Sequence, residues 1–353
     1  MPNSRTLTLI TIGLTFFGLI MIDSASVVDA ARDFGDKWYY LKLQSIWAIL
    51  GLGLFFLFSR INHQIFKKYA FPFFVVTVFL LLLVLIPGIG VKLQGARRWI
   101  NLGFFLLQPS ELAKLTMAIY FSTLLSTKKK YLPFFFTLGL VSLLIVLEPD
   151  LGTTLVIIGM GFLTYFGSGG RIRYLAGFSV LGLLAVMLMV IVSPYRLSRL
   201  ESYFNTRKDP LGSSYQIHQA LIALGSGNLF GLGLGQSRQK YNFLPEATTD
   251  SIFAIIGEEL GLVGSSALLL AFLILILRGF NSAGEAAMGF SQNLAVCLTS
   301  MIGIQAFINI SAITALFPLT GIPLTYISYG GSSLLIMLVA TGILVNIARS
   351  YEQ

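Results

Sequence analysis

Apolar runs, each long enough to cross a lipid bilayer as a helix, recur along almost the whole chain. A transmembrane helix needs roughly 20 such residues, and we count about ten runs that meet this need. With 56% hydrophobic and 11% charged residues, the chain is too apolar for a soluble domain of this length. We therefore predict an all-α, polytopic membrane protein of about ten transmembrane helices, folded as a single domain over residues 1–353. The predicted spans cover residues 7–22, 43–59, 70–87, 109–126, 132–147, 151–167, 174–193, 251–277, 288–316 and 332–348.

Positive charge is distributed unevenly between the two sets of connecting segments. If the N-terminus is cytoplasmic, the cytoplasmic segments hold eleven Lys and Arg against two carboxylates, and the outer segments hold twelve against ten. Because short cytoplasmic loops are enriched in Lys and Arg, we expect both termini in the cytoplasm. The net charge of +9 then reflects topology and attraction to anionic lipid, so no nucleic acid partner is expected.

The few cysteines and histidines exclude several kinds of site. Cys297 is the single cysteine and lies in an apolar span, so we interpret it as a small packing residue. His63 and His218 fall on opposite sides of the predicted membrane, which excludes a His-based metal centre and a Ser-His-Asp triad. The sequence requires no cofactor, although carboxylates could still hold Mg²⁺ or Mn²⁺, ions that accept oxygen ligands.

The longest segment between spans, residues 194–249, is predicted to lie on the outer face between the seventh and eighth helices. Loops of this length in a compact bundle are usually functional. It combines apolar stretches with scattered cations, among them Arg238 and Lys240. This pattern favours a path along the bilayer surface and contact with an anionic headgroup over a merely solvated connector.

Three carboxylates occupy an apolar stretch where they need partners or a function. Asp250 begins the stretch, where it either caps the following helix or performs chemistry beside the cationic loop. Glu258 and Glu259 lie about 12 Å further along a helix, which is too far for capping. We expect this pair to form a buried, hydrogen-bonded tie to a neighbouring helix.

A second polar group follows the third span. Arg97 and Arg98 are placed at the outer interface, and Glu111 and Lys114 fall on one face of the next predicted helix. The Glu111–Lys114 pair could be a structural ion pair, the polar floor of a substrate site, or both. Asp150 stands just before the sixth predicted span and is expected to be its N-cap.

Four blocks of the sequence resemble, in order, the signature blocks of the SEDS family of shape, elongation, division and sporulation proteins. They are GARRWINLGFFLLQPSELAKL from residue 95, EPDLGTTLVI from residue 148, the stretch from YQIHQALIALG at residue 215 to EELGLVG at residue 264, and TGIPLTYISYGGSSLL from residue 320. The resemblance covers nearly the whole chain. The stretch GLGQSRQKYNFLPEATTDSIFA and the early IDSASVV are more similar to the division branch than to the elongation branch, whereas TGIPL departs from the usual division pattern.

The resemblance implies a peptidoglycan glycosyltransferase that polymerises lipid II at the outer face of the bacterial cytoplasmic membrane, at the division septum. It places the essential aspartate at Asp250, acting as general base on the acceptor 4-hydroxyl, and a functional pair at Glu111 and Lys114. Further candidates for diphosphate contacts are Arg97, Arg98, Arg238 and Lys240. Many members have His and Phe where this chain has Thr248 and Ser251, which argues against a mechanism that needs a histidine beside the base.

Two other classes of function stay open on the residues alone. Intramembrane charges also fit a lipid II flippase or transporter, and a non-catalytic division scaffold is a third alternative. An elongation-type polymerase is the alternative within the family.

The resemblance also implies a partner that crosslinks the strands, a class B penicillin-binding protein, together with other division proteins. We expect its single membrane helix to dock where small residues allow close helix packing. The expected surface comprises Ser311, Ala312, Ala315, Ala340 and Gly342.

Overall fold

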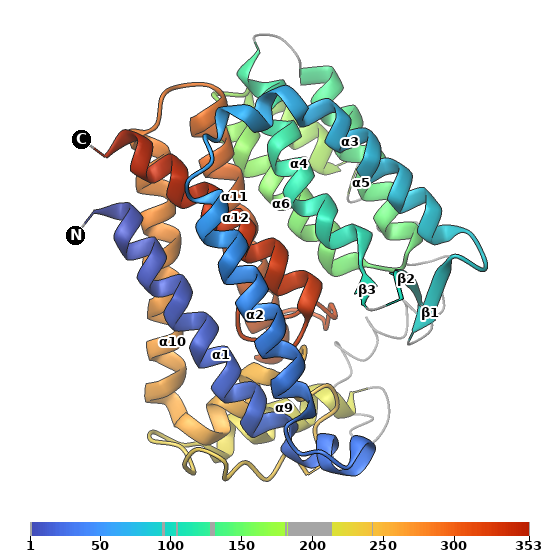
Figure 1. The fold of residues 1–353 in the computed structure, drawn as a ribbon, viewed down its shortest axis with the longest axis vertical. Helices are drawn as coiled ribbons and strands as arrows, with labels where there is room; N and C mark the ends of the chain where they lie inside the picture. Colours follow the sequence, from blue (N-terminus) through green and yellow to red (C-terminus); the bar gives the residue numbers. More distant parts are fainter. Residues whose placement is uncertain are drawn as a thin grey trace.

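The computed structural model describes residues 2–93, 96–103, 105–127, 131–180, 182, 214–241 and 243–352. Within these residues the fold is a bundle of long helices with one small sheet (Figure 1). The seventh predicted span, 174–193, and the first part of the outer loop, up to residue 213, lie largely outside the described residues. The helices are α1 Asn3–Phe34, α2 Tyr39–Phe58, α3 Gln64–Leu85, α4 Pro109–Ser126, α5 Tyr131–Leu147, α6 Leu151–Gly167, α9 Tyr215–Ser226, α10 Ile252–Glu285, α11 Phe290–Ile313 and α12 Gly331–Tyr351.

The helices coincide with nine of the ten predicted spans, so the prediction of an all-α polytopic membrane protein is confirmed. Six described helices are long and apolar enough to cross a membrane: α1, α2, α3, α10, α11 and α12. Helices α5 and α6 are apolar but shorter, and α4 carries two charged residues. The total of ten spans is therefore not established by the described helices.

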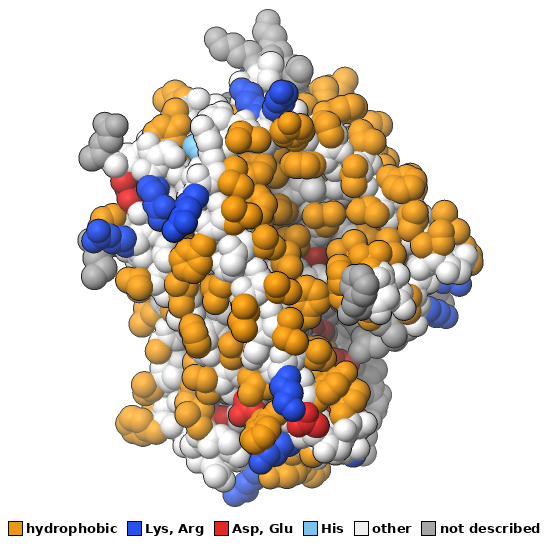
Figure 2. Space-filling model, in the orientation of Figure 1, with side chains coloured by type: hydrophobic (Ala, Val, Ile, Leu, Met, Phe, Trp, Pro, Cys, Tyr) orange, Lys and Arg blue, Asp and Glu red, His pale blue; other side chains and the backbone are white. Residues whose placement is uncertain are grey.

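Both chain termini lie at one end of the bundle, and α9 lies at the opposite end (Figure 1). Hydrophobic side chains cover most of the face between the charged side chains near the termini and those at the α9 end (Figure 2). A broad apolar surface between two polar ends is the surface that a bilayer-spanning bundle requires.

A three-stranded antiparallel sheet, which the sequence did not predict, forms between α3 and α4. Its strands are β1 Gly90–Leu93, β2 Ala96–Asn101 and β3 Leu106–Leu107, in the order β1-β2-β3. Strand β2 carries Arg97 and Arg98. The sheet thus fixes the backbone of both arginines, which a free loop would leave mobile.

Helix α10 is broken at Gly261, whose φ of 66° and ψ of −166° are not helical. Residues 251–259, before the break, are buried on every side, whereas the part after it exposes Leu262, Leu270 and Leu277. An additional Cβ at Gly261 would collide with the backbone of Gly231 and Leu229, so a side chain is excluded there by contact as well as by backbone conformation. The prediction of one continuous helix over 251–277 is therefore wrong at this point.

The surface expected to dock a partner helix is not available for docking. Four of its five residues, Ser311, Ala312, Ala340 and Gly342, are buried, and Ala315 is half-buried. Gly342 allows α12 to pack directly on α2, because a Cβ there would collide with the backbone of Phe55. These small residues serve packing within the bundle, so the predicted surface is wrong.

Candidate functional site

Three successive carbonyl groups lead into Asp250, and each accepts a hydrogen bond from a different donor. The backbone N–H of Tyr329 donates to Thr248 O at 2.9 Å, and the Ser328 hydroxyl donates to Thr249 O at 2.5 Å. The side-chain amide of Asn309 donates to the carbonyl oxygen of Asp250 at 2.8 Å. Because the peptide units on both sides of Asp250 are held, the position of its Cα is fixed by the surrounding structure.

The carboxyl group of Asp250 is half-buried and faces a backbone turn at Gly321. A Cβ on Gly321, whose φ is 74°, would lie 3.5 Å from Oδ2 of Asp250. Helix α10 begins two residues later, at Ile252, with Ser251 as its N-cap. The Ser251 hydroxyl accepts from Gln216 of α9 at 3.0 Å. Asp250 therefore does not occupy the capping position that was the structural alternative to a chemical role.

Two amides one turn apart on α11 hold the segment that surrounds Asp250. Asn309 donates to Ile322 O at 2.8 Å, and Gln305 donates to Pro323 O at 3.0 Å. The oxygen of Gln305 accepts from the Lys114 ammonium at 2.5 Å. Helix α11 thus connects Lys114 on α4 to the turn beside Asp250.

Lys114 and Glu111 form an ion pair in the interior of the bundle. Lys114 Nζ lies 2.7 Å from Glu111 Oε1, and the two side chains are 0% and 3% exposed. The second carboxylate oxygen, Oε2, is buried and has no hydrogen-bond partner among the described residues. A buried pair of this kind depends strongly on both members, because removal of one leaves the other charged and uncompensated.

The turn between α5 and α6 packs against the same segment. Asp150 is the N-cap of α6, where its Oδ1 accepts from the Thr153 N–H at 3.0 Å. Its Oδ2 accepts from Ser110 at 3.2 Å, which ties the turn to the start of α4. Gly152 lies directly on Thr320 and Ile322, where a Cβ would collide with the Ile322 side chain.

The Arg98 side chain donates its hydrogen bonds to this turn and not to an open site. Its Nε donates to Glu148 O at 2.9 Å, and its Nη2 donates to Pro149 O. Arg97, in contrast, lines an open pocket of about 280 Å³ together with Lys92 and Pro149. Of the two adjacent arginines, Arg97 is therefore the better placed to meet an anionic ligand.

Glu148 is a fully buried carboxyl group at the start of the turn. Neither of its oxygens has a hydrogen-bond partner among the described residues. Burial, and then the nearby charge of Asp150, raise its pKa to about 9, although Arg98 opposes the shift. Glu148 is consequently a neutral acid at physiological pH.

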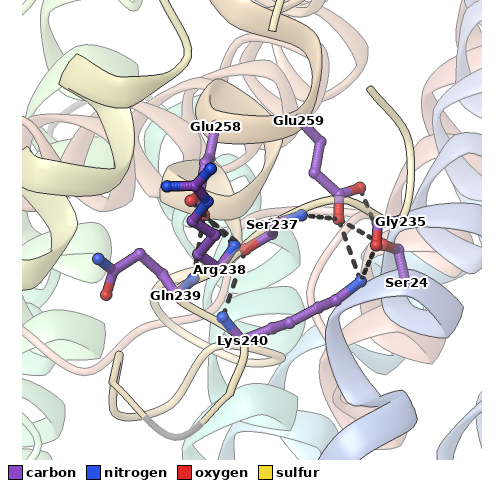
Figure 3. Close-up of polar contacts among 8 residues, drawn as sticks. All are labelled: Ser24, Gly235, Ser237, Arg238, Gln239, Lys240, Glu258 and Glu259. Atoms are coloured by element: carbon purple, nitrogen blue, oxygen red, sulfur yellow. Dashed lines mark hydrogen bonds and ion pairs between the residues drawn. The ribbon is translucent and has the colours of Figure 1, made fainter. Parts of the chain in front are cut away.

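Glu258 and Glu259 fasten residues 235–240, in the segment before Asp250, to α10 and α1 (Figure 3). Glu258 accepts from the Ser237 hydroxyl and from the backbone N–H groups of Arg238 and Gln239. Glu259 accepts from Ser24 of α1 at 2.7 and 2.8 Å and from Ser237 N at 3.3 Å. Both carboxylates thus have internal partners, but Glu259 bonds to a neighbouring helix as expected, whereas Glu258 bonds to the segment at residues 237–239 instead.

Lys240, expected to contact a diphosphate, is buried within this network instead. Its ammonium donates to Gly235 O at 2.7 Å and lies 3.5 Å from Glu259 Oε1. The Lys240 side chain is 3% exposed, so its charge interacts with groups inside the protein and not with a bound ligand. The side chain of Arg238 is exposed, which leaves it free to meet an anion.

Among the residues that the structure describes, no three His, Cys, Asp or Glu side chains gather closely enough to hold a metal ion. A Mg²⁺ or Mn²⁺ ion held by one or two carboxylates together with substrate phosphates stays a prediction.

All four sequence blocks converge on one place in the fold. Arg98 contacts the turn at residues 148–152, Gly152 packs on Thr320 and Ile322, and the 320–329 segment grips the chain at Asp250. Sequence reasoning missed Gln305 and Asn309, which join the parts. The sequence feature that could have identified them is a pair of amides four residues apart on one face of an otherwise apolar span.

This architecture defines a class: multi-pass helical membrane proteins with a rigidly held acid at the bundle end opposite the termini. The family model described as cell cycle protein, which covers FtsW, RodA and SpoVE, matches residues 5–353. The chain belongs to this family.

Individual relatives match over almost their whole length. The chain is 43% identical to stage V sporulation protein E of Bacillus subtilis, covering 97% of this chain and 96% of that protein. It is 41% identical to the probable peptidoglycan glycosyltransferase FtsW of Geobacter metallireducens, covering 96% and 93%.

Solved structures share the fold at lower identity. A chain of a peptidoglycan synthase complex that coordinates polymerization and crosslinking has a TM-score of 0.80 and 27% identity, with 98% of each chain covered. The rod shape determining protein RodA of Thermus thermophilus has a TM-score of 0.72 and 27% identity, covering 98% of this chain and 97% of that one.

Proposed function

We propose that this protein is a peptidoglycan glycosyltransferase that polymerises lipid II, the undecaprenyl-diphosphate-linked disaccharide peptide, at the outer face of the cytoplasmic membrane. The names of its FtsW relatives support the activity. We assign the active site to Asp250 because hydrogen bonds to three successive carbonyls hold its backbone in place.

Asp250 is proposed to act as the general base. Its carboxylate takes the proton from the 4-hydroxyl of the acceptor sugar while that oxygen attacks C1 of the donor sugar. The bond from C1 to the diphosphate oxygen breaks, and undecaprenyl diphosphate leaves as an anion. A leaving group of this kind needs no general acid, so one carboxylate suffices.

Cations at the outer end are proposed to stabilise the diphosphate. Arg97 is the leading candidate because it lines an open pocket, and Arg238 is the second because its side chain is exposed. Arg98 and Lys240 act indirectly, since the first holds the 148–152 turn and the second holds the outer segment. Glu111 and Lys114 support the site through Gln305.

The biological setting follows the same reasoning. Both termini are proposed to be cytoplasmic, and the protein to work at the division septum or in sporulation with a class B penicillin-binding protein that crosslinks the strands. Support comes from the peptidoglycan synthase complex that shares the fold and from the division and sporulation relatives.

Purified protein supplied with fluorescent lipid II tests the proposal. A polymerase converts the lipid into glycan chains in detergent and needs no closed membrane. A flippase only moves it between leaflets of a vesicle, and a scaffold does neither. Failure to form polymer with the crosslinking partner present would refute the proposal.

A further inference from the structure

Residues 228–241, the outer segment that precedes Asp250, bury one of their two charged side chains and expose most of their hydrocarbon. Lys240 is buried against Glu259, and the Glu258 carboxylate beneath the segment is buried as well (Figure 3). Within residues 228–241, Arg238 is the one charged residue with an exposed side chain. A loop in water shows the opposite arrangement, with its charges in solvent and its large apolar groups covered.

Large apolar side chains form the outward face of the segment. Phe230 is 80% exposed, and Leu229 and Leu234 are each 57% exposed. Leu232 and Tyr241 are exposed as well. An apolar patch of this size marks a surface that is covered by something other than water.

The backbone of the segment is paired with the broken part of α10. Leu232 N donates to Glu258 O and Gly233 N to Glu259 O, each at 3.0 Å. In return, Leu262 N donates to Asn228 O at 2.9 Å and Val263 N to Leu229 O at 3.0 Å. Irregular backbone is tolerated at membrane depth only where its polar groups are satisfied within the protein, and this pairing meets that condition.

The depth of the segment follows from the length of α10. Leu262 and Arg278 are separated by 16 residues, a rise of about 24 Å at 1.5 Å per residue. The hydrocarbon core is about 30 Å thick. With the Arg278 guanidinium at the boundary on the side of the termini, Leu262 and the bonded Asn228 and Leu229 therefore lie inside the opposite leaflet. Tilt of the helix shortens the rise and strengthens the conclusion.

We propose that residues 228–234 are embedded in the lipid leaflet on the α9 side, with Arg238 and Tyr241 at its headgroup level. The occupant of the apolar patch is phospholipid, because the patch continues the lipid-facing stripe of α10 at Leu262 and Val263. The immersed segment holds the chain that leads to Asp250 at a fixed depth. This inference is independent of the proposed chemistry.

Site-directed spin labelling in vesicles tests the immersion. Phe230→Cys and Leu234→Cys carry the label in vesicles of phosphatidylethanolamine and phosphatidylglycerol that contain no other protein. Leu270→Cys, on the exposed face of α10, is the control in lipid, and Met288→Cys, 93% exposed between α10 and α11, is the control in water. The native Cys297 is fully buried, so we expect it not to react with the label, and the wild-type protein gives the background signal.

The readout is collision of the label with oxygen, which concentrates in lipid, and with a water-soluble nickel complex. We expect nickel collisions at residues 230 and 234 to fall well below the level at residue 288, and oxygen collisions to rise toward the level at residue 270, which lies nearer the centre of the bilayer. Nickel collisions at the level of residue 288 would overturn the proposal and show that the patch is either wet or reserved for a protein partner.

A second measurement covers the case in which labelling disturbs the fold. Phe230→Trp in vesicles with brominated acyl chains should show quenching of the added indole emission relative to unbrominated vesicles, with the wild-type emission subtracted. Unquenched added emission would equally overturn the proposal.

Discussion

The side-chain amide of Asn309 bonds to the Asp250 carbonyl and to the Ile322 carbonyl, each at 2.8 Å. One side chain thereby fixes the proposed base relative to the turn that faces its carboxylate. The site is held from α11, a helix that carries no charged residue in its described range.

Replacing Asn309 with Leu should reduce kcat with little change in KM. The substitution nearly preserves volume but leaves two carbonyls unpaired, a penalty of about 1–3 kcal/mol for each buried group. A loss of roughly tenfold or more in kcat corresponds to about 1.4 kcal/mol or more of misplacement. Polymerisation rates measured across lipid II concentrations check this.

Thr299→Val on the same helix is the matched control. Thr299 is buried, and its hydroxyl has no partner among the described residues, so no hydrogen bond is lost. Equal activity of Asn309→Leu and Thr299→Val would contradict a positioning role for Asn309.

The Glu111–Lys114 pair should behave as one unit. Glu111→Gln and Lys114→Met each leave one buried charge uncompensated, and breaking such a pair costs about 3–5 kcal/mol. The double variant should be no worse than the worse single one, because it removes both charges. Thermal unfolding and polymerisation of all three variants check this, and strictly additive losses would indicate two independent roles.

Glu148 should make stability depend on pH. The unfolded chain releases the Glu148 proton near pH 4.5, whereas burial keeps it bound in the folded protein up to a pKa of about 9. The unfolded state therefore binds fewer protons in this window, and stability falls as pH rises from about 4.5 to about 9. Glu148→Gln, which is always neutral, should escape this loss.

Unfolding temperatures at both ends of the window test the Glu148 prediction. The variant should gain a few degrees over the wild type at the alkaline end and much less at the acidic end. A difference between variant and wild type that stays constant with pH would mean that the carboxyl is not held neutral.

Helix positions could be predicted because bilayer thickness sets the length of apolar runs and polar turns end them. The bounds of α4, α5 and α6 agree with the predicted spans to within one residue. Asp150 was predictable as an N-cap because Pro149 and the following apolar run leave little local alternative. These features depend on neighbours in sequence.

Features that depend on distant residues could not be predicted. The break at Gly261 is stabilised by backbone groups at residues 228–233, and a glycine inside an apolar run does not reveal that pairing. Lys240 is buried because Glu259 lies beneath it, which its surrounding sequence does not show. The small residues near Gly342 pack inside the bundle. This could not be predicted, because composition does not distinguish an internal contact from a docking surface.

Asp250→Asn tests the central claim most directly. The amide nearly matches the carboxylate in shape and leaves the backbone bonds from Asn309 in place, but it cannot act as a base. Asp36→Asn, at a carboxylate that is 38% exposed in the turn between α1 and α2, is the control. With purified protein, its partner and fluorescent lipid II, we predict normal folding for both variants, full polymerisation by Asp36→Asn and none by Asp250→Asn. Wild-type glycan synthesis by Asp250→Asn would contradict the account.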